Sequence, residues 1–399
     1  MIKNKLLISS KISPPKKGTI MKRSFIREIL ESIDEETISF AGGLPDETLF
    51  PLEDLKQANA KVYENAKNLQ YTTSNGIVTL REKIADFYNE DGFQTQADNI
   101  LITTGSQQAL YIIAKYFEKR DIVIEKPSYL GAVNIFNMNS LDMKPIMLHD
   151  DGIDIEAFKD AYKRTKLAYL IPDFQNPKAS LYSDAKRRKV AKTILKSGGY
   201  IIEDAPYSEL YFEKKSKSIS SQIPENSLHL GSFSKTLSPS LRLGWVRANT
   251  EIIKELVKIK ETIDLHSCSI VQHTLINYLQ ESQRYKCHLQ NIRDSYKNKM
   301  NFFAQALQKH LPAFHFSKPK GGMFIYGRIE GIDSYELVQK CMKEKVVFVP
   351  ANQFYLEDNI SNEIRFNFTH TNEEEVEKGL KIIYNILHNF CYSYNKGRT

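Results

Sequence analysis

The chain has 399 residues, of which 41% are hydrophobic and 26% are charged, so it is an ordinary globular protein rather than a disordered or fibrous one. Its formal net charge of +7 comes from 55 Lys and Arg against 48 Asp and Glu. Residues 1–27 hold eight basic side chains and no acidic one, which leaves 47 − 48 = −1 for the remainder. This distribution argues against a general affinity for nucleic acid or membrane surfaces.

The sequence also excludes several other classes of protein. No run reaches the about 18 apolar residues that a membrane span needs, and Leu6-Leu7-Ile8 is too short for the core of a signal peptide. We therefore expect a cytoplasmic protein, with a mitochondrial presequence as the alternative because residues 1–27 are basic and free of acid. The four cysteines form no C-x-x-C pair and the nine histidines have no compact metal spacing, so neither a disulfide framework nor a metal site is expected.

Residues 1–23 form a basic leader that we expect to be flexible. A helix is predicted from Ser24, followed by an extended stretch at 38–40 and a loop at 41–45. From residue 100 onward, short apolar runs alternate with helical segments, which predicts a mostly parallel sheet covered by helices. The predicted strands lie at 100–102, 122–124, 167–171, 200–202, 228–230 and 243–246, and the predicted helices at 106–118, 154–164 and 184–197.

Past residue 250 the pattern changes to long helices at 250–265 and 270–312, followed by strands at 323–326, 346–349 and 364–368. This change predicts a second, smaller α+β domain. The predicted fold class is therefore α/β, with a mostly parallel seven-stranded sheet sandwiched by helices in the large domain. The expected parts are the leader at 1–23, a small-domain segment at 24–50, the large domain at 51–250, connecting helices at 251–290 and the C-terminal small domain at 291–399.

Chemically unusual residues follow five of the predicted strands. They include hydroxyls, an amide, an acid, an aromatic ring, a lysine and an arginine. In open α/β sheets ligands bind beyond the carboxyl ends of the strands, so we expect these residues to share one crevice. The segments are Thr103 to Gln108, Glu125 to Tyr129, Pro172 to Pro177, Glu203 to Tyr207, and Gly231 to Lys235 with Arg242.

The residue types at these strand ends suit a small phosphorylated aldehyde better than a nucleotide. Free N–H groups at a helix start, hydroxyls and an arginine favour a phosphate, yet neither a P-loop nor a dinucleotide fingerprint lies near these strands. Lys235 suggests an aldehyde bound as a Schiff base, and Asp204 suggests a ring nitrogen kept protonated. Together these demands describe pyridoxal 5′-phosphate. The candidate phosphate ligands are Gly105, Ser106, Gln107, Ser232, Ser234 and Arg242.

Three of these segments resemble the fold-type-I pyridoxal-phosphate aminotransferases of class I and II. They are Gly231 to Pro239 with Arg242, Asp204-x-x-Tyr207, and Gln175-Asn176-Pro177. Within that family the chain is most similar to the branch of 2-aminoadipate, kynurenine and related broad-specificity aminotransferases. The resemblance covers roughly residues 24–388, and its motifs are specific as a set. Supporting stretches are Ser39 to Pro45, Leu69-Gln70-Tyr71, Thr103 to Ala109, Lys320 to Phe324, Phe348-Val349-Pro350 and Arg365.

The resemblance implies a role for each residue that surrounds the cofactor ring. Lys235 is implied to form the Schiff base and to move the α-proton of the substrate. Asp204 is implied to pair with the pyridinium nitrogen and keep it protonated. Asn176 and Tyr207 are implied to hydrogen-bond the phenolic oxygen of the ring, while Tyr129 stacks on its face.

The resemblance also implies contacts with the substrate and with a second subunit. Arg365 is implied to grip the substrate α-carboxylate, with Gly43 allowing the backbone to approach, and Arg27 matches an arginine that some members use for a distal carboxylate. Tyr71 is implied to reach the phosphate of the neighbouring subunit, so we expect a homodimer with shared active sites. In one departure, residues 176–179 read Asn-Pro-Lys-Ala instead of the usual Asn-Pro-Thr-Gly. Alanine restricts positive φ, so a rearranged turn is expected there.

The implied reaction moves the amino group of an L-amino acid to a 2-oxo acid, with 2-oxoglutarate as the expected acceptor and with neither nucleic acid nor membrane as a partner. Two alternatives stay open. Pyridoxal-phosphate lyases and decarboxylases share the same cofactor residues. A transcription regulator with an aminotransferase-like effector domain would need an N-terminal winged-helix domain, and only residues 1–23 precede the aminotransferase-like part, so this alternative requires a truncated chain.

Overall fold

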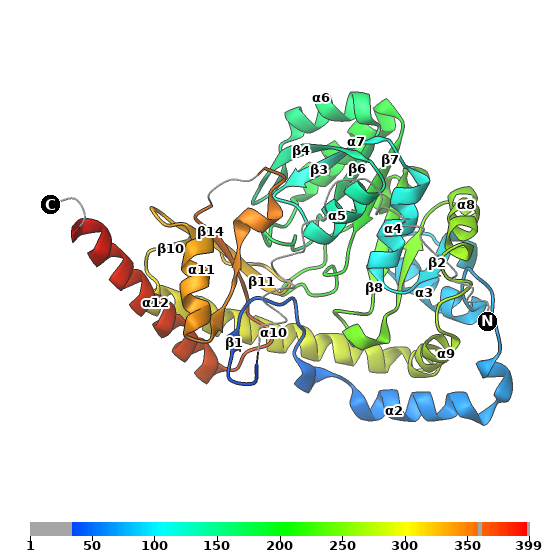
Figure 1. The fold of residues 1–399 in the computed structure, drawn as a ribbon. Coiled ribbons are helices and arrows are strands. Elements are labelled where there is room, and N and C mark those ends of the chain that lie inside the picture. The colour runs from blue at the N-terminus through cyan, green and yellow to red at the C-terminus, as the bar shows by residue number, and fades with distance from the viewer. Residues whose placement is uncertain (1–33, 358–360, 397–399) are drawn as a thin grey trace, which may run out of the picture.

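The computed structural model describes residues 34–357 and 361–396, and three β-sheets organise this part of the chain. Helices surround the eight-stranded sheet, and the four-stranded sheet lies beside the C-terminal helices (Figure 1). The basic leader, the helix predicted from Ser24 and the Arg27 assignment lie outside the described residues. The α/β fold predicted from the sequence is confirmed, and the exact domain boundaries stay a prediction.

The large sheet has the strand order β2-β9-β8-β7-β6-β3-β4-β5. Adjacent strands from β8 to β4 pair in parallel, whereas β9 runs antiparallel to both β2 and β8. As a result the carboxyl ends of five strands, β2, β3, β6, β7 and β8, lie at the same edge of the sheet. The strands are β2 (Ile100–Thr103), β3 (Asp121–Lys126), β4 (Asp142–His149), β5 (Gly152–Ile153), β6 (Leu167–Leu170), β7 (Tyr200–Asp204), β8 (Ser227–Ser232) and β9 (Gly244–Arg247).

Five of the helices that cover this sheet are α4 (Ser106–Tyr116), α5 (Leu130–Met138), α6 (Ile155–Thr165), α7 (Asp184–Ser197) and α8 (Thr250–Glu261). Strand residues alternate between two layers of them. Ile122 and Ile124 pack in a buried cluster with α4, α5 and α8, while Val123 packs in another with α6 and α7. Side chains of a strand point to opposite faces in turn, so strands buried on both faces read as unbroken apolar runs. This is why the sequence predicted these strands.

The large sheet has eight strands rather than the seven predicted, and two of its strands were not located from the sequence. β4 is mostly exposed or half-buried, and its short apolar run at 146–148 directly follows Pro145. β5 has only two residues and pairs antiparallel with β4. An edge strand needs less burial than a central one, and its pattern is correspondingly weak.

The prediction of one long helix at 270–312 is wrong, because two helices occupy this range. They are α9 (Ser269–Tyr278) and α10 (Ser282–His310). Leu279 is buried in a cluster with α3 (Val78–Glu90), and Glu281 takes an extended conformation before α10 begins. Neither glycine nor proline marks the break, so it left no signal in the sequence.

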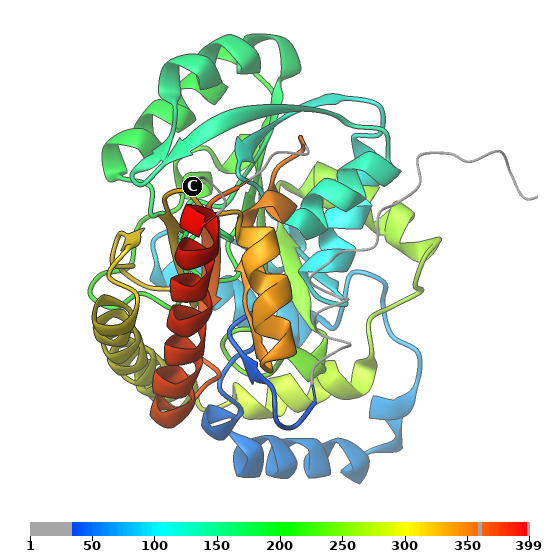
Figure 2. The same cartoon turned by 60° about the vertical axis from the view of Figure 1, so that its left-hand side comes forward.

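The small sheet has the order β10-β11-β14-β13, and all of its neighbours pair antiparallel. In addition, the N-terminal strand β1 (Ile38–Ser39) pairs in parallel with β12 (Val346–Val347). Helices α11 and α12 lie side by side in this part of the molecule (Figure 2). The remaining elements named below are α2 (Leu52–Ala60), β10 (Phe314–Phe316), β11 (Phe324–Ile329), α11 (Ser334–Lys343), β13 (Val349–Pro350), the short 3-10 helix η8 (Ala351–Phe354), β14 (Glu363–Asn367) and α12 (Glu373–Lys396).

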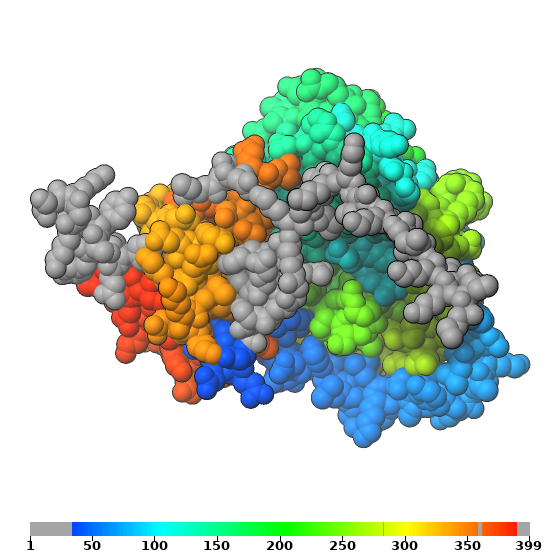
Figure 3. Space-filling view, in the orientation of Figure 1, coloured from blue at the N-terminus to red at the C-terminus, as the bar shows by residue number. Residues whose placement is uncertain are grey.

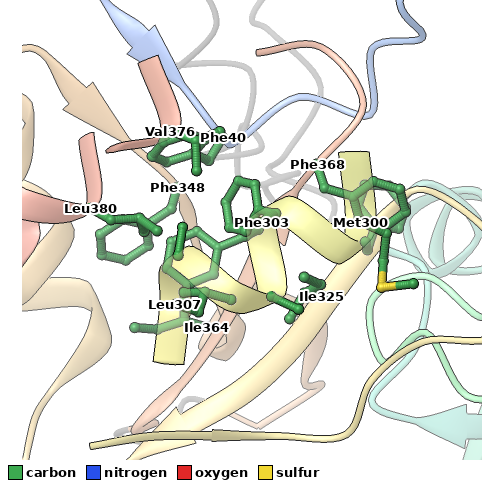
Figure 4. Close-up of a cluster of buried hydrophobic side chains, with 14 of the residues drawn as sticks. Phe40, Met300, Phe303, Leu307, Ile325, Phe348, Ile364, Phe368, Val376 and Leu380 are labelled. Atoms are coloured by element: carbon green, nitrogen blue, oxygen red, sulfur yellow. The ribbon is translucent and has the colours of Figure 1, made fainter. Parts of the chain in front are cut away.

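One hydrophobic cluster joins the N-terminal segment to the C-terminal elements (Figure 4). Phe303 of α10 lies within it and is fully buried. Its ring lies edge-on to that of Phe40, with 5.2 Å between the ring centroids. It is tilted relative to the ring of Phe366, with 5.9 Å between the centroids. Phe40 follows β1 and Phe366 lies on β14, so this one side chain connects three segments that are far apart in the sequence.

We expect Phe303→Ala to lower the free energy of unfolding by about 3–5 kcal/mol, because it removes a fully buried ring and leaves a cavity between three segments. Urea unfolding followed by circular dichroism measures this loss. Phe302→Ala is the matched control, since this neighbouring side chain is only partly buried and its removal should cost clearly less. Equal losses in the two variants would contradict the assignment of Phe303 to the centre of the cluster.

Candidate active site

Residues from several strand ends and from the small sheet converge at the carboxyl edge of the large sheet. Lys235 comes shortly after β8, and its Nζ donates a hydrogen bond of 2.7 Å to the carbonyl oxygen of Gly43. Burial, together with the nearby cations Arg365 and Arg242, lowers the pKa of Lys235 to about 8. About a tenth of this amine is therefore neutral at pH 7 and about half at pH 8, and a neutral amine can act as a nucleophile.

Asp204 ends β7 and is buried. Its Oδ2 accepts a hydrogen bond of 2.8 Å from the hydroxyl of Tyr169, while its Oδ1 has no partner among the described residues. Burial raises the pKa of Asp204 to about 6, although the Tyr169 hydrogen bond opposes the rise. A buried carboxylate oxygen of this kind is suited to a protonated ring nitrogen, which would supply both the missing donor and a compensating charge.

The start of α4 forms an anion cradle with the loop that follows β8. Gly105 precedes the helix at φ +78°, and a Cβ there would lie 2.7 Å from Nη2 of Arg242. The hydroxyl of Ser106 is buried without a partner among the described residues. Nη1 of Arg242 lies 3.5 Å from the Ser234 hydroxyl, and the backbone N–H of Ser234 donates to the Ser232 hydroxyl at 3.1 Å. Helix N–H groups, hydroxyls and a guanidinium together suit a phosphate.

Arg365 on β14 reaches the same edge from the small sheet and is buried. It donates at 2.6 Å to the side-chain oxygen of Asn176 and at 2.5 Å to the carbonyl of Ala41. The guanidinium carbon lies 4.2 Å from the ring centroid of Phe324 and 5.1 Å from that of Phe354. Burial lowers the pKa of Arg365 to about 10. Its Nε has no partner among the described residues, so the group retains capacity for an anionic ligand.

Two tyrosines and a glutamine complete the set that meets at this edge. Tyr207 is buried, and its ring lies edge-on to Phe324 at 5.9 Å between centroids. Burial raises the pKa of Tyr207, so its hydroxyl keeps its proton and can donate it in a hydrogen bond. Tyr129 precedes α5, and its hydroxyl donates to Oε1 of Gln107 at 3.5 Å.

Tyr71 does not join this cluster within the described chain. Its side chain is 78% exposed, and its ring lies edge-on to His266 at 5.7 Å. The loop that carries His266 also contains Asp264, whose Oδ2 accepts hydrogen bonds of 3.1 Å from both Thr104 and Gln108. Tyr71 therefore lies at the protein surface, against the loop of His266 and Asp264. Hydrogen bonds from Thr104 and Gln108 to Asp264 connect this loop to the start of α4, which is part of the anion cradle.

At the turn of residues 176–179, alanine occupies the left-handed region that it normally disfavours. Ala179 has φ +56°, and its N–H donates to the carbonyl of Gln175 at 2.6 Å. Lys178 extends away from the other candidate residues, and its Nζ donates to the carbonyl of Leu148 at 2.7 Å. Hydrogen bonds hold the alanine in a conformation that glycine adopts with less strain.

Sequence reasoning missed several residues that hold the candidate ones in place. Tyr169 lies inside an apolar run and looked like a core residue, yet its hydroxyl binds Asp204. Asp264 lies in a predicted helical stretch. Glu125 directly follows the apolar run at 122–124, and its place at a strand end was a usable signal, but no role was predicted for it. Within residues 34–357 and 361–396, no group of three or more His, Cys, Asp or Glu side chains could hold a metal ion, and no helix there is long and apolar enough to cross a membrane.

Comparison with known proteins matches the family model of aminotransferase class I and II to residues 35–383. The chain is 32% identical over 378 residues to aromatic-amino-acid aminotransferase 1 of Thermococcus litoralis, with 90% of each chain covered. Among solved structures, α-aminoadipate aminotransferase of Thermus thermophilus complexed with N-(5′-phosphopyridoxyl)-L-leucine has a TM-score of 0.86 at 30% identity, covering 93% of this chain and 96% of that one. Kynurenine aminotransferase of Pyrococcus horikoshii in complex with PMP has a TM-score of 0.87 at 30% identity, covering 93% and 95%.

We expect Asp204→Asn to stabilise the ligand-free protein near neutral pH. The folded-state pKa of about 6 lies above the ordinary aspartate value of 3.8, so the folded state binds more protons than the unfolded state between these values. Wild-type stability therefore falls as the pH rises from about 4 to about 6, by up to about 3 kcal/mol, and stays lower above that range. The asparagine variant does not titrate and avoids this loss.

Urea unfolding of the ligand-free protein from about pH 4 to about pH 8 measures the difference. The gain should be small near pH 4 and should reach its full size by about pH 7. Asp86→Asn, a change of the same kind at an exposed position of α3, should leave stability nearly unchanged across the range. An Asp204→Asn protein less stable than wild type at pH 7 would show that the aspartate stabilises the fold as an anion.

Proposed function

The chain belongs to the class I and II aminotransferases, and from this membership we propose how its residues carry out amino-group transfer. As an aminotransferase it moves the amino group of an amino acid to a 2-oxo acid, and its cofactor is pyridoxal 5′-phosphate. As the acceptor we propose 2-oxoglutarate. The observation that carries this function is the desolvated amine of Lys235, held at the carbonyl of Gly43 with Arg365 and Arg242 nearby.

The buried polar atoms without partners fit this cofactor. The hydroxyl of Ser106 and the N–H groups at the start of α4 suit its phosphate, with Arg242 and the serines of the neighbouring loop. The free Oδ1 of Asp204 suits its ring nitrogen, and Asn176 and Tyr207 suit its phenolic oxygen. When bound, the cofactor supplies an aldehyde that condenses with amines and a ring that takes up electrons. Tyr129 is assigned to the face of that ring.

Lys235 is the proposed nucleophile and the proposed proton carrier. Its lowered pKa raises the share of the neutral form that both tasks need, compared with an ordinary lysine at the same pH. The nearby charges of Arg365 and Arg242 contribute to that lowered pKa, so the residues that bind anions also tune the lysine. The hydrogen bond from Nζ to the carbonyl of Gly43 places this amine at the carboxyl edge of the sheet, where the cofactor aldehyde would bind it.

Arg365 is the proposed ligand of the substrate α-carboxylate. The side-chain oxygen of Asn176 and the carbonyl of Ala41 hold its guanidinium in place, and the rings of Phe324 and Phe354 exclude water from it. A desolvated guanidinium binds a carboxylate more strongly than one in water does. Amino donors and 2-oxo acceptors both carry this carboxylate, so one arginine serves both half-reactions. Arg27 as the ligand of a distal carboxylate stays a prediction, as does a cytoplasmic location.

We further propose a homodimer in which Tyr71 serves the site of the partner subunit. Six apolar side chains that are 46–69% exposed lie in two segments of the chain. The two segments lie near each other, because the ring of Tyr71 in segment 52–78 contacts that of His266, which directly follows segment 263–265. Helix α2 of the first segment forms the lower edge of the molecule in Figure 3. Burial of such side chains between two copies would remove them from water. They are Leu52, Tyr63, Leu69, Val78, Ile263 and Leu265.

We expect Lys235→Ala to remove both the yellow colour of the purified protein and its transaminase activity, because no other described lysine takes its place at the strand edge. Absorbance spectra and an assay with an amino acid and 2-oxoglutarate measure the two losses. Lys178→Thr is the matched control and should stay yellow, since Lys178 extends away from the site. A Lys235→Ala protein that transaminates at the wild-type rate would refute the assignment.

Mixed dimers of Lys235→Ala and Tyr71→Ala subunits should recover activity that neither homodimer has. If Tyr71 serves the partner's site, one site of each mixed dimer has both residues intact. Random pairing at an equal ratio makes about half of the dimers mixed, so the activity of the mixture rises toward about a quarter of the wild-type value. If Tyr71 serves its own subunit, both sites stay defective. Co-refolding the two variants at several ratios and measuring activity decides between these arrangements, and a mixture that stays inactive would contradict the shared site.

A further inference from the structure

Glu125 is a buried acid that the proposed roles leave unused. It lies near the end of β3 and is 1% exposed. Its Oε1 accepts hydrogen bonds from the backbone N–H of Ile171 at 3.1 Å and from the hydroxyl of Tyr182 at 2.8 Å. Its Oε2 accepts one from Nε2 of Gln175 at 3.0 Å. All three donors belong to the segment that leaves β6, so one carboxyl group fastens that segment to β3.

Gln175 carries this attachment to the turn that follows. The side chain is fully buried, and its Nε2 also donates to the carbonyl of Pro127 at 2.9 Å. Its Oε1 accepts from the backbone N–H of Lys178 at 2.8 Å, and its own carbonyl accepts from Ala179 at 2.6 Å. The side-chain amide and the carbonyl of Gln175 are thus all hydrogen-bonded, to Glu125 and Pro127 near the end of β3 and to Lys178 and Ala179 within the turn. The position of Gln175 therefore sets the course of the turn.

Asn176 is the next residue, and its side-chain oxygen accepts the 2.6 Å hydrogen bond from Arg365. A displacement of Gln175 would move Asn176 relative to this guanidinium. Burial raises the pKa of Glu125, and its hydrogen bonds with Tyr182, Gln175 and Ile171 oppose that rise by favouring the ionised form. A carboxyl group in such a place is costly, and the cost is offset only while its donors stay in position.

We propose that Glu125 is a positioning residue, which acts through Gln175 to hold Asn176 in place for both the cofactor ring oxygen and Arg365. This inference rests on the proposed function, because it needs the cofactor at the strand edge. Glu125 itself touches neither cofactor nor substrate. It fixes the distance between the strand end that carries Tyr129 and the turn that carries Asn176.

Glu125→Gln tests this role with little change of shape. The new side chain has one acceptor oxygen and one NH₂ group, whereas the site offers donors on both sides. If the NH₂ group faces Gln175, it meets another NH₂ group. If it faces the other way, it meets the N–H of Ile171. In either orientation a donor meets a donor, so the turn must shift, and Gln175→Met breaks the same connection from its other end.

The readout is the pH midpoint at which the visible absorption band of the holoenzyme titrates. A hydrogen bond from Asn176 to the ring oxygen stabilises the deprotonated form of the bound cofactor, so a displaced Asn176 raises this midpoint. We expect a rise of about one pH unit in Glu125→Gln and in Gln175→Met. The KM for the amino donor should rise several-fold with a smaller change in kcat. Asp204, Arg242 and Arg365, the charged groups around the cofactor, are unchanged in both variants.

Glu203→Gln is the matched control. Glu203 is a fully buried glutamate on β7, and it accepts hydrogen bonds from the backbone N–H groups of Ile219 at 3.0 Å and Ser220 at 2.6 Å. Neither of these donors belongs to the turn that carries Asn176. The control should lose stability in urea unfolding while its titration midpoint stays at the wild-type value. A purely structural role for Glu125 would give the same result as this control.

The possible outcomes separate this inference from the proposed function. A wild-type protein without a visible band that depends on Lys235 would overturn the proposed function and the inference with it. A wild-type protein that titrates, together with unshifted midpoints in Glu125→Gln and Gln175→Met, would overturn the inference alone. If Glu125→Gln fails to fold, Gln175→Met decides, because Glu125 keeps two of its three donors in that variant.

Discussion

Burial of charged groups at one edge of the eight-stranded sheet is the constraint on which the rest of the structure depends. Desolvation lowers the pKa of Lys235 to about 8 and that of Arg365 to about 10, and it raises the pKa of Asp204 to about 6. Each shift favours the neutral form, so each charged form needs partners that replace water. A cofactor with a phosphate and a ring nitrogen supplies partners of this kind, which links stability of the site to its occupation.

The two sheets meet at that edge because the segment after β1 and strand β14 both reach it. The carbonyls of Ala41 and Gly43 come from the N-terminal segment, and Arg365 comes from β14. The pairing of β1 with β12 and the buried cluster around Phe303 hold these two segments together. Packing far from the chemistry therefore sets where the proposed carboxylate ligand lies relative to the nucleophile.

Much of the fold could be predicted from the sequence because parallel strands buried on both faces leave strong apolar runs. The same runs located the strand ends, and Lys235, Asp204, Asn176 and Ser106 all lie where those ends converge. β4 was not located, since it is mostly half-buried or exposed and its short apolar run directly follows Pro145. The break before α10 has no glycine or proline. Tyr169 looked like a core residue, because its ring is core and only its hydroxyl reaches Asp204.

The sequence by itself determined the α/β class, the family and the set of chemical groups at the strand ends, since these follow from local patterns and motifs. Only the tertiary structure decided that Ala179 keeps a left-handed conformation, that Tyr71 faces outward, and that Glu125 fastens the turn carrying Asn176. It also decided the direction of each pKa shift. Desolvation and hydrogen bonding depend on neighbours that are distant in the sequence, such as Arg365 and Asn176, which stand 189 positions apart. No local pattern records such pairs.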